Sequence, residues 1–164
     1  MDTIKQLIQQ YCPDGVEYKK LGEVCKVFRG KRLTKKELSE EGQYPVFHGG
    51  LEPIGYYSES NRSAESVMII DVGASAGTIG YSNVAFWSSD GCFCLSHVPE
   101  LNQRFLYFYL QSCEKAIKSK VRRAGIPTLD NRDVENFSVP VPPLPIQHKI
   151  VEILDNFTDR LSKI

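Results

Sequence analysis

The sequence has no long apolar segment. Among its 164 residues, no run approaches the roughly 18 consecutive apolar residues that a membrane-spanning helix requires. Residues 1–10 form an amphipathic pattern, with Ile4, Leu7 and Ile8 at helical spacing, and they lack the apolar centre of a secretory signal. The sequence therefore predicts a protein that stays in the cytoplasm and has no membrane partner.

The five cysteines have none of the regularity of a disulfide framework. Thiols stay reduced in the cytoplasm. His97 follows Cys92 and Cys94, which raises the question of zinc, but no second pair of ligands stands at a usable spacing. In a strand Cys92 and Cys94 would share one face, so we expect buried thiols and no metal site.

Catalytic signatures are missing as well. The P-loop pattern that holds nucleotide phosphates does not occur, nor do the glycine-rich cofactor loop and the Asn/Asp-Pro-Pro-aromatic motif of adenine methyltransferases. Asp14 and Glu17 resemble nuclease carboxylates, but they are three residues apart on a turn. A hydrolase using Ser75 is a weaker alternative, because no histidine has an orienting carboxylate nearby in sequence. We therefore expect no catalytic residues and no cofactor bound by this chain.

The net charge is zero, which at first argues against a nucleic-acid partner. The basic residues are nevertheless clustered. Six lie in residues 26–36 with no acid among them, and five lie in residues 113–123 beside one acid. We call these segments the first and second basic windows. Runs of this kind are often solvated surface, so they indicate DNA binding only if the fold brings them together.

The periodicity of apolar residues predicts short strands between two helical regions. Residues 16–28 favour a strand pair or an irregular strand, in which we expect these side chains to face the core: Leu21, Val24 and Val27. Residues 44–98 alternate short apolar stretches with glycines, which predicts short strands and tight turns. Asn102 can cap a helix with this inner stripe: Phe105, Leu106, Tyr109, Leu110, Cys113 and Ile117.

The pattern changes after the proline-rich segment 139–145. Apolar residues then recur at spacings of three and four, as in an amphipathic helix: Ile146, Ile150, Ile153, Phe157, Leu161 and Ile164. We expect the prolines to project this helix away from the globular body towards a partner helix, and packing on its own domain is the alternative. The predicted boundary separates a domain of residues 1–143 from a helix of residues 144–164.

Several segments stand in an order that is typical of one family: LGEVCKVFRGK, YPVFHGG, VMIIDVGASAGTIGY, NQRFLYFYLQS and GIPTLDNRDVENFSVPVPPLPIQHKIVEILD. The last is the most diagnostic, because a G-x-P-x-L strip leads into V-P-x-P-P-L-x-x-Q and an apolar helix. In this order the chain resembles one target-recognition domain and the start of one conserved helix of a type I restriction-modification specificity subunit. The resemblance covers essentially the whole chain.

The resemblance implies an α+β (mixed α/β) fold, with a twisted, mainly antiparallel sheet, flanking helices and a projecting C-terminal helix. It implies a non-catalytic module that reads one half of a bipartite target in double-stranded DNA. Methylation subunits using S-adenosylmethionine, and restriction subunits using ATP and Mg²⁺, would do the chemistry. The helix would pair with that of a second repeat or a second copy, through these residues: Ile146, Gln147, Ile150, Val151, Ile153, Leu154, Phe157 and Leu161.

Individual DNA contacts are predicted from side-chain chemistry, because recognition loops differ between members of the family. Arginine and lysine bind both phosphates and base edges, which selects these residues: Arg29, Lys31, Arg32, Lys35, Lys36, Arg122 and Arg123. Predicted turns that could enter a groove add these: His48, Gly49, Gly50, Tyr56, Tyr57 and Ser75. The alternative function is a protein-interaction module without DNA specificity, in which the terminal helix is the working surface.

Overall fold

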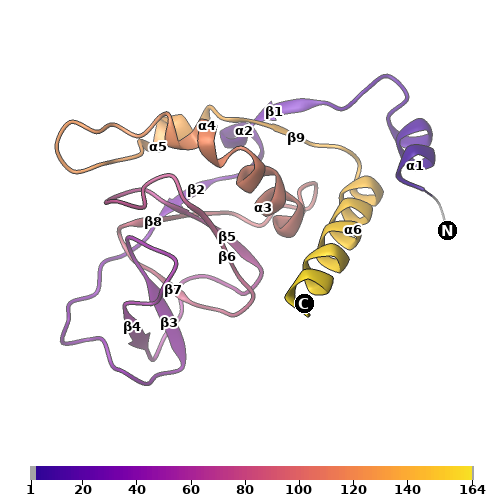
Figure 1. Cartoon of the computed structure of the whole chain (residues 1–164). Helices are drawn as coiled ribbons and strands as arrows, with labels where there is room; N and C mark the ends of the chain where they lie inside the picture. Colours follow the sequence, from indigo (N-terminus) through magenta and orange to yellow (C-terminus); the bar gives the residue numbers. More distant parts are fainter. Residues whose placement is uncertain (1–2, 164) are drawn as a thin grey trace.

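The fold consists of three small sheets with helices along one side (Figure 1). The computed structural model describes residues 3–163, and Ile164 of the predicted apolar stripe lies outside them. The strands are β1 (Tyr18–Lys20), β2 (Val27–Arg29), β3 (Tyr44–Phe47), β4 (Gly55–Tyr57), β5 (Ser66–Ile70), β6 (Ile79–Ser82), β7 (Trp87–Ser88), β8 (Cys92–Leu95) and β9 (Ser138–Pro140). The helices are α1 (Ile4–Tyr11), α2 (Leu21–Val24), α3 (Gln103–Ser112), α4 (Glu114–Lys118), α5 (Asn131–Glu135) and α6 (Leu144–Ser162).

The main sheet has four antiparallel strands in the order β2-β8-β5-β6. The second sheet, β4-β3-β7, contains one antiparallel pair and one parallel pair. Strands β1 and β9 form a separate antiparallel pair that joins the two ends of the chain. The predicted mixed fold with mainly antiparallel sheets is confirmed.

Strand β5 lies at the centre of the core, and all of its residues are buried. Val67 and Ile69 belong to the main apolar cluster, which includes the inner face of α3. Met68 and Ile70 point the other way and pack with Phe47 of the second sheet, because side chains alternate along a strand. Because both faces of the strand are covered, residues 67–70 are all apolar.

The buried cysteines follow the same alternation. Cys92 and Cys94 on β8 face the cluster between the two sheets, and both are free thiols. His97 lies elsewhere, exposed, with its Nε2 atom 3.0 Å from the Ser66 hydroxyl. Within residues 3–163 no group of three or more His, Cys, Asp or Glu side chains could hold a metal ion.

Short helices account for the local departures from prediction. Residues 16–28 are interrupted by α2, whose first turn is capped when Glu23 accepts a hydrogen bond from the Lys20 N–H at 3.2 Å. Helix α5 was not predicted, since five residues show little periodicity; it begins where Asp130 accepts a hydrogen bond from the Arg132 N–H at 2.8 Å. The predicted Asn102 cap of α3 is confirmed, with a 2.9 Å bond from the Phe105 N–H.

Helix α6 starts inside the domain. Its N-cap is Pro143, and Pro145 sits in the first turn, where a missing N–H costs no hydrogen bond. Ile146 is only 2% exposed and packs in a small cluster with Leu7 of α1. The prediction that the prolines project the whole helix away is therefore wrong for its first turns, which pack on α1 and α3.

The apolar stripe of α6 is exposed only towards its C-terminal end. Ile153, Phe157 and Leu161 have exposed fractions of 45%, 61% and 56%. Ile146 and Gln147 are instead buried within this chain, so both are corrected from the predicted helix interface to internal packing. The Ile146 side chain packs against the chain's own α1, and the Gln147 amide forms hydrogen bonds within the domain, so neither is available to a partner helix. No helix within residues 3–163 is long and apolar enough to cross a membrane.

Candidate nucleic-acid interface

The fold brings the two basic windows to one side of the domain. The loop after β2 and the loop that follows α4 both lie on the left of Figure 1, away from α6. Backbone hydrogen bonds link them in steps: the first window bonds to Ser88, Gly91 bonds to Asp71, and Asp71 and Gly73, in the β5–β6 loop of residues 71–78, bond to Leu129 and Pro127. The two windows thus lie on the same side of the domain and are linked through residues 71–73 and 88–91.

The first basic window is fixed to the second sheet. The Lys31 N–H donates to the Ser88 carbonyl at 2.9 Å, and the Trp87 indole donates to the Lys31 carbonyl at 2.7 Å. A Cβ atom at Gly30 would lie 1.9 Å from the Ser89 carbonyl oxygen, so only glycine fits here. The backbone is thus held while the predicted side chains are exposed: Arg29, Lys31, Arg32, Lys35 and Lys36.

The second basic window ends in a loop that is also held by its backbone. Arg122 and Thr128 exchange two hydrogen bonds, at 2.8 and 3.0 Å. The Gly73 N–H donates to the Pro127 carbonyl at 2.9 Å, which ties this loop to the β5–β6 loop. Arg122 and Arg123 are both exposed at its rim.

The β5–β6 loop lies between the windows. On one side, a Cβ atom at Gly77 would lie 2.7 Å from Cγ of Lys118 in the second window. On the other side, Val72 approaches Gly91, which also lies against the ring of His48. Ser75 is half-buried within this loop. Residues from both windows, from the β5–β6 loop and from the end of β3 therefore form one continuous edge.

A groove of about 490 Å³ opens beside the first window. Arg32, Lys35 and His48 contribute to its walls. The Nδ1 atom of His48 lies 3.1 Å from a carboxylate oxygen of Asp90, and this contact holds the imidazole at the wall of the groove. Glu40 and Asp90 line the same groove, so its two cationic side chains and one imidazole stand beside two carboxylates and suit a base edge with mixed donors and acceptors better than a bare phosphate.

The other predicted turn residues are partly withdrawn into the second sheet. The Tyr57 ring packs edge-on against Trp87 at a centroid distance of 5.0 Å, within a small core that includes Leu33. Tyr57 thus has a packing role in this structure, and Tyr56 is half-buried in the same strand. Gly49 and Gly50 are half-buried at the end of β3, close to the groove.

Sequence reasoning missed a buried carboxyl directly behind this edge. Asp71, at the end of β5, is 2% exposed, and its Oδ1 atom has no hydrogen-bond partner among the described residues. Burial raises the pKa of Asp71 to about 6, and the positive charge of Arg29 opposes that rise. A single aspartate after an apolar strand carries no sequence signal for such an environment.

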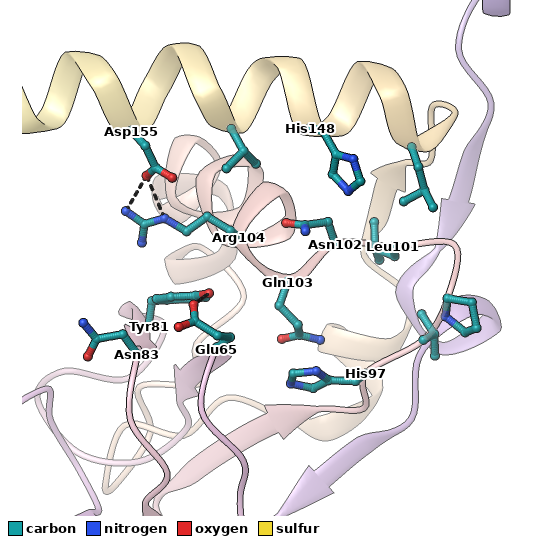
Figure 2. A pocket seen from close by; sticks show the side chains of 14 residues that line it. Glu65, Tyr81, Asn83, His97, Leu101, Asn102, Gln103, Arg104, His148 and Asp155 are labelled. Carbon is teal, nitrogen blue, oxygen red and sulfur yellow. Dashed lines mark hydrogen bonds and ion pairs between the residues drawn. The ribbon is translucent and has the colours of Figure 1, made fainter.

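A second and larger groove, of about 730 Å³, lies where α6 crosses the start of α3 and the edge strand β6 (Figure 2). Beside it, the fully buried Gln147 binds three backbone groups. Its Oε1 atom accepts from the Asn102 N–H, and its Nε2 atom donates to the carbonyls of Glu100 and Pro142, each at 2.8 Å. Gln147 therefore anchors α6 to its own domain.

The same groove holds an ion pair between Arg104 of α3 and Asp155 of α6 (Figure 2). Arg104 and Asp155 lie in two different segments of the sequence, 51 positions apart, so no sequence pattern pointed to this pairing.

The fold and the site define a class of binding domain. Exposed cations on rigid loops form one edge of a mixed α+β domain, and an amphipathic helix leaves from the other side. The chain belongs to the family described as the type I restriction modification DNA specificity domain, whose sequence profile matches residues 13–164.

Individual relatives agree with this membership. The chain is 30% identical over 148 residues to a protein of Mycoplasma genitalium described as a type I specificity subunit, covering 87% of this chain and 39% of the relative. It is 25% identical over 174 residues to the type I restriction enzyme MjaVIII specificity subunit of Methanocaldococcus jannaschii, covering 99% and 40%. The chain thus spans about two fifths of the length of these relatives.

Solved structures show the same fold. The crystal structure of the type I restriction-modification system S subunit from M. genitalium matches with a TM-score of 0.81 at 28% identity, over 96% of this chain and 42% of that one. The HsdS subunit from Thermoanaerobacter tengcongensis matches with a TM-score of 0.70 at 23% identity, over 98% and 43%. The second likeness supports the fold alone.

Proposed function

We propose that this chain reads one half of a bipartite sequence in double-stranded DNA and performs no chemistry itself. Membership of the specificity-domain family supports the class of target. The observation that carries the proposal is the continuous edge formed by the two basic windows and the β5–β6 loop. Side chains on a fixed backbone can be matched to one arrangement of phosphates and base edges.

The proposed contacts lie along this edge. Phosphates are bound by exposed cations of both windows: Arg29, Lys31, Arg32, Lys35, Lys36, Arg122 and Arg123. Residues of the neighbouring turns approach the bases, with glycine permitting close contact: His48, Gly49, Gly50 and Ser75. Glu37, which directly follows the first window in sequence, accepts hydrogen bonds from the Thr34 N–H and hydroxyl at 2.7 and 3.0 Å.

Partners are proposed from the exposed part of α6. Ile153, Phe157 and Leu161 are suited to a second helix, from another specificity repeat or a second copy, with the half-buried Leu154 at the flank. The predicted interface residues Ile150 and Val151 pack instead on the chain's own core. Methylation and restriction subunits would then supply the chemistry, with S-adenosylmethionine, ATP and Mg²⁺ bound by those partners. This chain would hold no cofactor and would act in the cytoplasm.

The test replaces two cations of the first window, Arg29→Ala with Arg32→Ala. Binding to a fluorescent duplex library is followed by anisotropy over a range of salt concentrations. We expect weaker binding, and a slope of log affinity against log salt that falls by about one for each phosphate that is no longer bound. The matched control is Lys5→Ala with Arg160→Ala, which removes the same charge from exposed sites on α1 and α6. Equal effects of the two pairs would contradict the assigned interface.

The second candidate is an interaction module that pairs through α6 without DNA specificity, which the exposed apolar stripe favours. Phe157→Ser with Leu161→Ser separates the two functions. For a DNA-reading module, this variant loses self-association in sedimentation experiments and still binds one half-site. For a pure interaction module, the wild-type chain associates and binds no duplex above background.

A further inference from the structure

The contact between Arg104 and Asp155 joins the recognition domain to α6. The Nε and Nη2 atoms of Arg104 lie 2.9 and 2.8 Å from the same Oδ1 atom of Asp155. Both side chains are partly buried, with exposed fractions of 27% and 39%. Hydrogen bonds to charged groups in such partly buried sites are shorter and stronger than neutral ones.

Aromatic rings hold the guanidinium group in one orientation. Its central carbon lies 4.6 Å from the ring centroid of Phe108, 4.8 Å from that of Tyr81 and 5.1 Å from that of Tyr107. Tyr81 is itself fixed by donating a hydrogen bond to Glu65, and burial together with that bond raises the pKa of its hydroxyl. The three rings therefore hold the planar cation of Arg104 in the orientation that it has in the ion pair with Asp155.

Helix α6 is attached to the domain at two directional points. Gln147 fixes its start through three backbone hydrogen bonds, and Asp155 lies eight residues further on, about 12 Å along a helix. Ile150 and Val151 pack against the main core between these points. Apolar contacts are non-directional and permit small rotations. The ion pair is thus the contact that opposes swinging of the helix about Gln147.

We propose that the Arg104–Asp155 pair is a positioning contact that sets the direction in which α6 leaves the domain. Resting on the proposed function, we infer further that it sets the distance between two half-site readers. A swing of about 10° over the roughly 22 Å of helix between Gln147 and the end of α6 displaces that end by about 4 Å, which exceeds the roughly 3.4 Å rise of one base pair. Without the ion pair, the choice of spacer length would then be relaxed.

The first test measures direction without DNA. Spin labels are placed at exposed helix positions, Gln111→Cys on α3 and Thr158→Cys on α6, after Cys113→Ser removes the half-buried thiol. Pulsed electron resonance gives the distance distribution between the labels. We expect one narrow peak for the parent chain and a distribution at least twice as broad for Asp155→Asn, which keeps the shape of the side chain.

Two further variants complete this test. Glu152→Gln removes the Lys149–Glu152 pair within α6, which spans 3.5 Å, and should leave the peak unchanged. Arg104→Lys keeps the charge but loses the planar group, so we expect intermediate broadening and a folded protein. Parent-like distributions for both Asp155→Asn and Arg104→Lys would overturn the proposal.

The second test measures spacing with the assembled protein. Two half-sites are placed on duplexes whose spacer varies one base pair at a time. The parent protein should favour one spacer by at least tenfold, and Asp155→Asn should reduce that preference severalfold with little change on a single half-site. Broadened distances with no DNA binding by the parent would refute the proposed function and leave the positioning contact standing. Broadened distances with an unchanged spacer preference would overturn the inference about spacing.

Discussion

Gly30 shows how one residue shapes the proposed DNA edge. Its hydrogen occupies a space in which a Cβ atom would lie 1.9 Å and 2.3 Å from the carbonyl oxygens of Ser89 and Ser88. We expect Gly30→Ala to separate the first basic window from the second sheet and to lower the free energy of unfolding by about 2 to 4 kcal/mol. Urea unfolding checks this. The control is Gly50→Ala, where a Cβ atom meets nothing within 4 Å, and similar losses for both would contradict the packing described.

Asp71 predicts a pH dependence of stability. Its folded pKa of about 6 lies above the ordinary value of 3.8, so the folded protein holds the proton more tightly than the unfolded chain. The stabilisation is complete below about pH 4 and is lost as the pH rises to 6. Asp71→Asn has no such loss, so between pH 4 and pH 7 its unfolding free energy should gain about 1 to 3 kcal/mol relative to wild type. Parallel stability curves for the two proteins would exclude this environment for Asp71.

For individual residues, the sequence predicted which side chains are exposed better than it predicted which residues they contact. Charge identified Arg29, Arg32 and Arg122 as surface cations, because such side chains are rarely buried unpaired. The sequence pattern could not show that the Tyr57 ring packs on Trp87, because that contact depends on how the strands of the second sheet pair. It also could not show which aspartate is buried.

At the scale of elements, Gln147 decides how α6 begins. Replacing it by leucine leaves one N–H and two carbonyl groups without their present partner. We expect Gln147→Leu to cost about 3 to 5 kcal/mol of unfolding free energy, as measured by denaturant titration. Asn156→Leu adds the same side chain at an exposed position of the same helix and should change stability by less than about 0.5 kcal/mol. A neutral Gln147→Leu would show that α6 is not anchored here.

Long periodic elements were predictable, and short ones were not. Helices α3 and α6 show clear apolar stripes, whereas α2 and α5 depend on caps from Glu23 and Asp130. The path of α6 was only half predictable. Prolines mark where it starts, but its direction depends on contacts with Arg104, from a distant part of the chain.

At the scale of the whole molecule, the two proposed surfaces lie on opposite sides. The basic edge is on the left of Figure 1, and α6 runs down the right. Clustering of cations at that edge reconciles a net charge of zero with a nucleic-acid partner. The order of the sequence segments indicated the family. The placing of the two basic windows on one side could not be predicted, because it depends on the loop after β5, which lies between them in the fold.

The most direct test of the central claim is selection from a randomised duplex library. The purified chain is used alone and with its cognate methylation subunit, at low and high salt. The account predicts enrichment of a short or two-part sequence, with affinity that falls steeply as salt rises. Absence of enrichment in every condition, from a folded protein that still self-associates, would contradict DNA reading and leave α6 as the working surface.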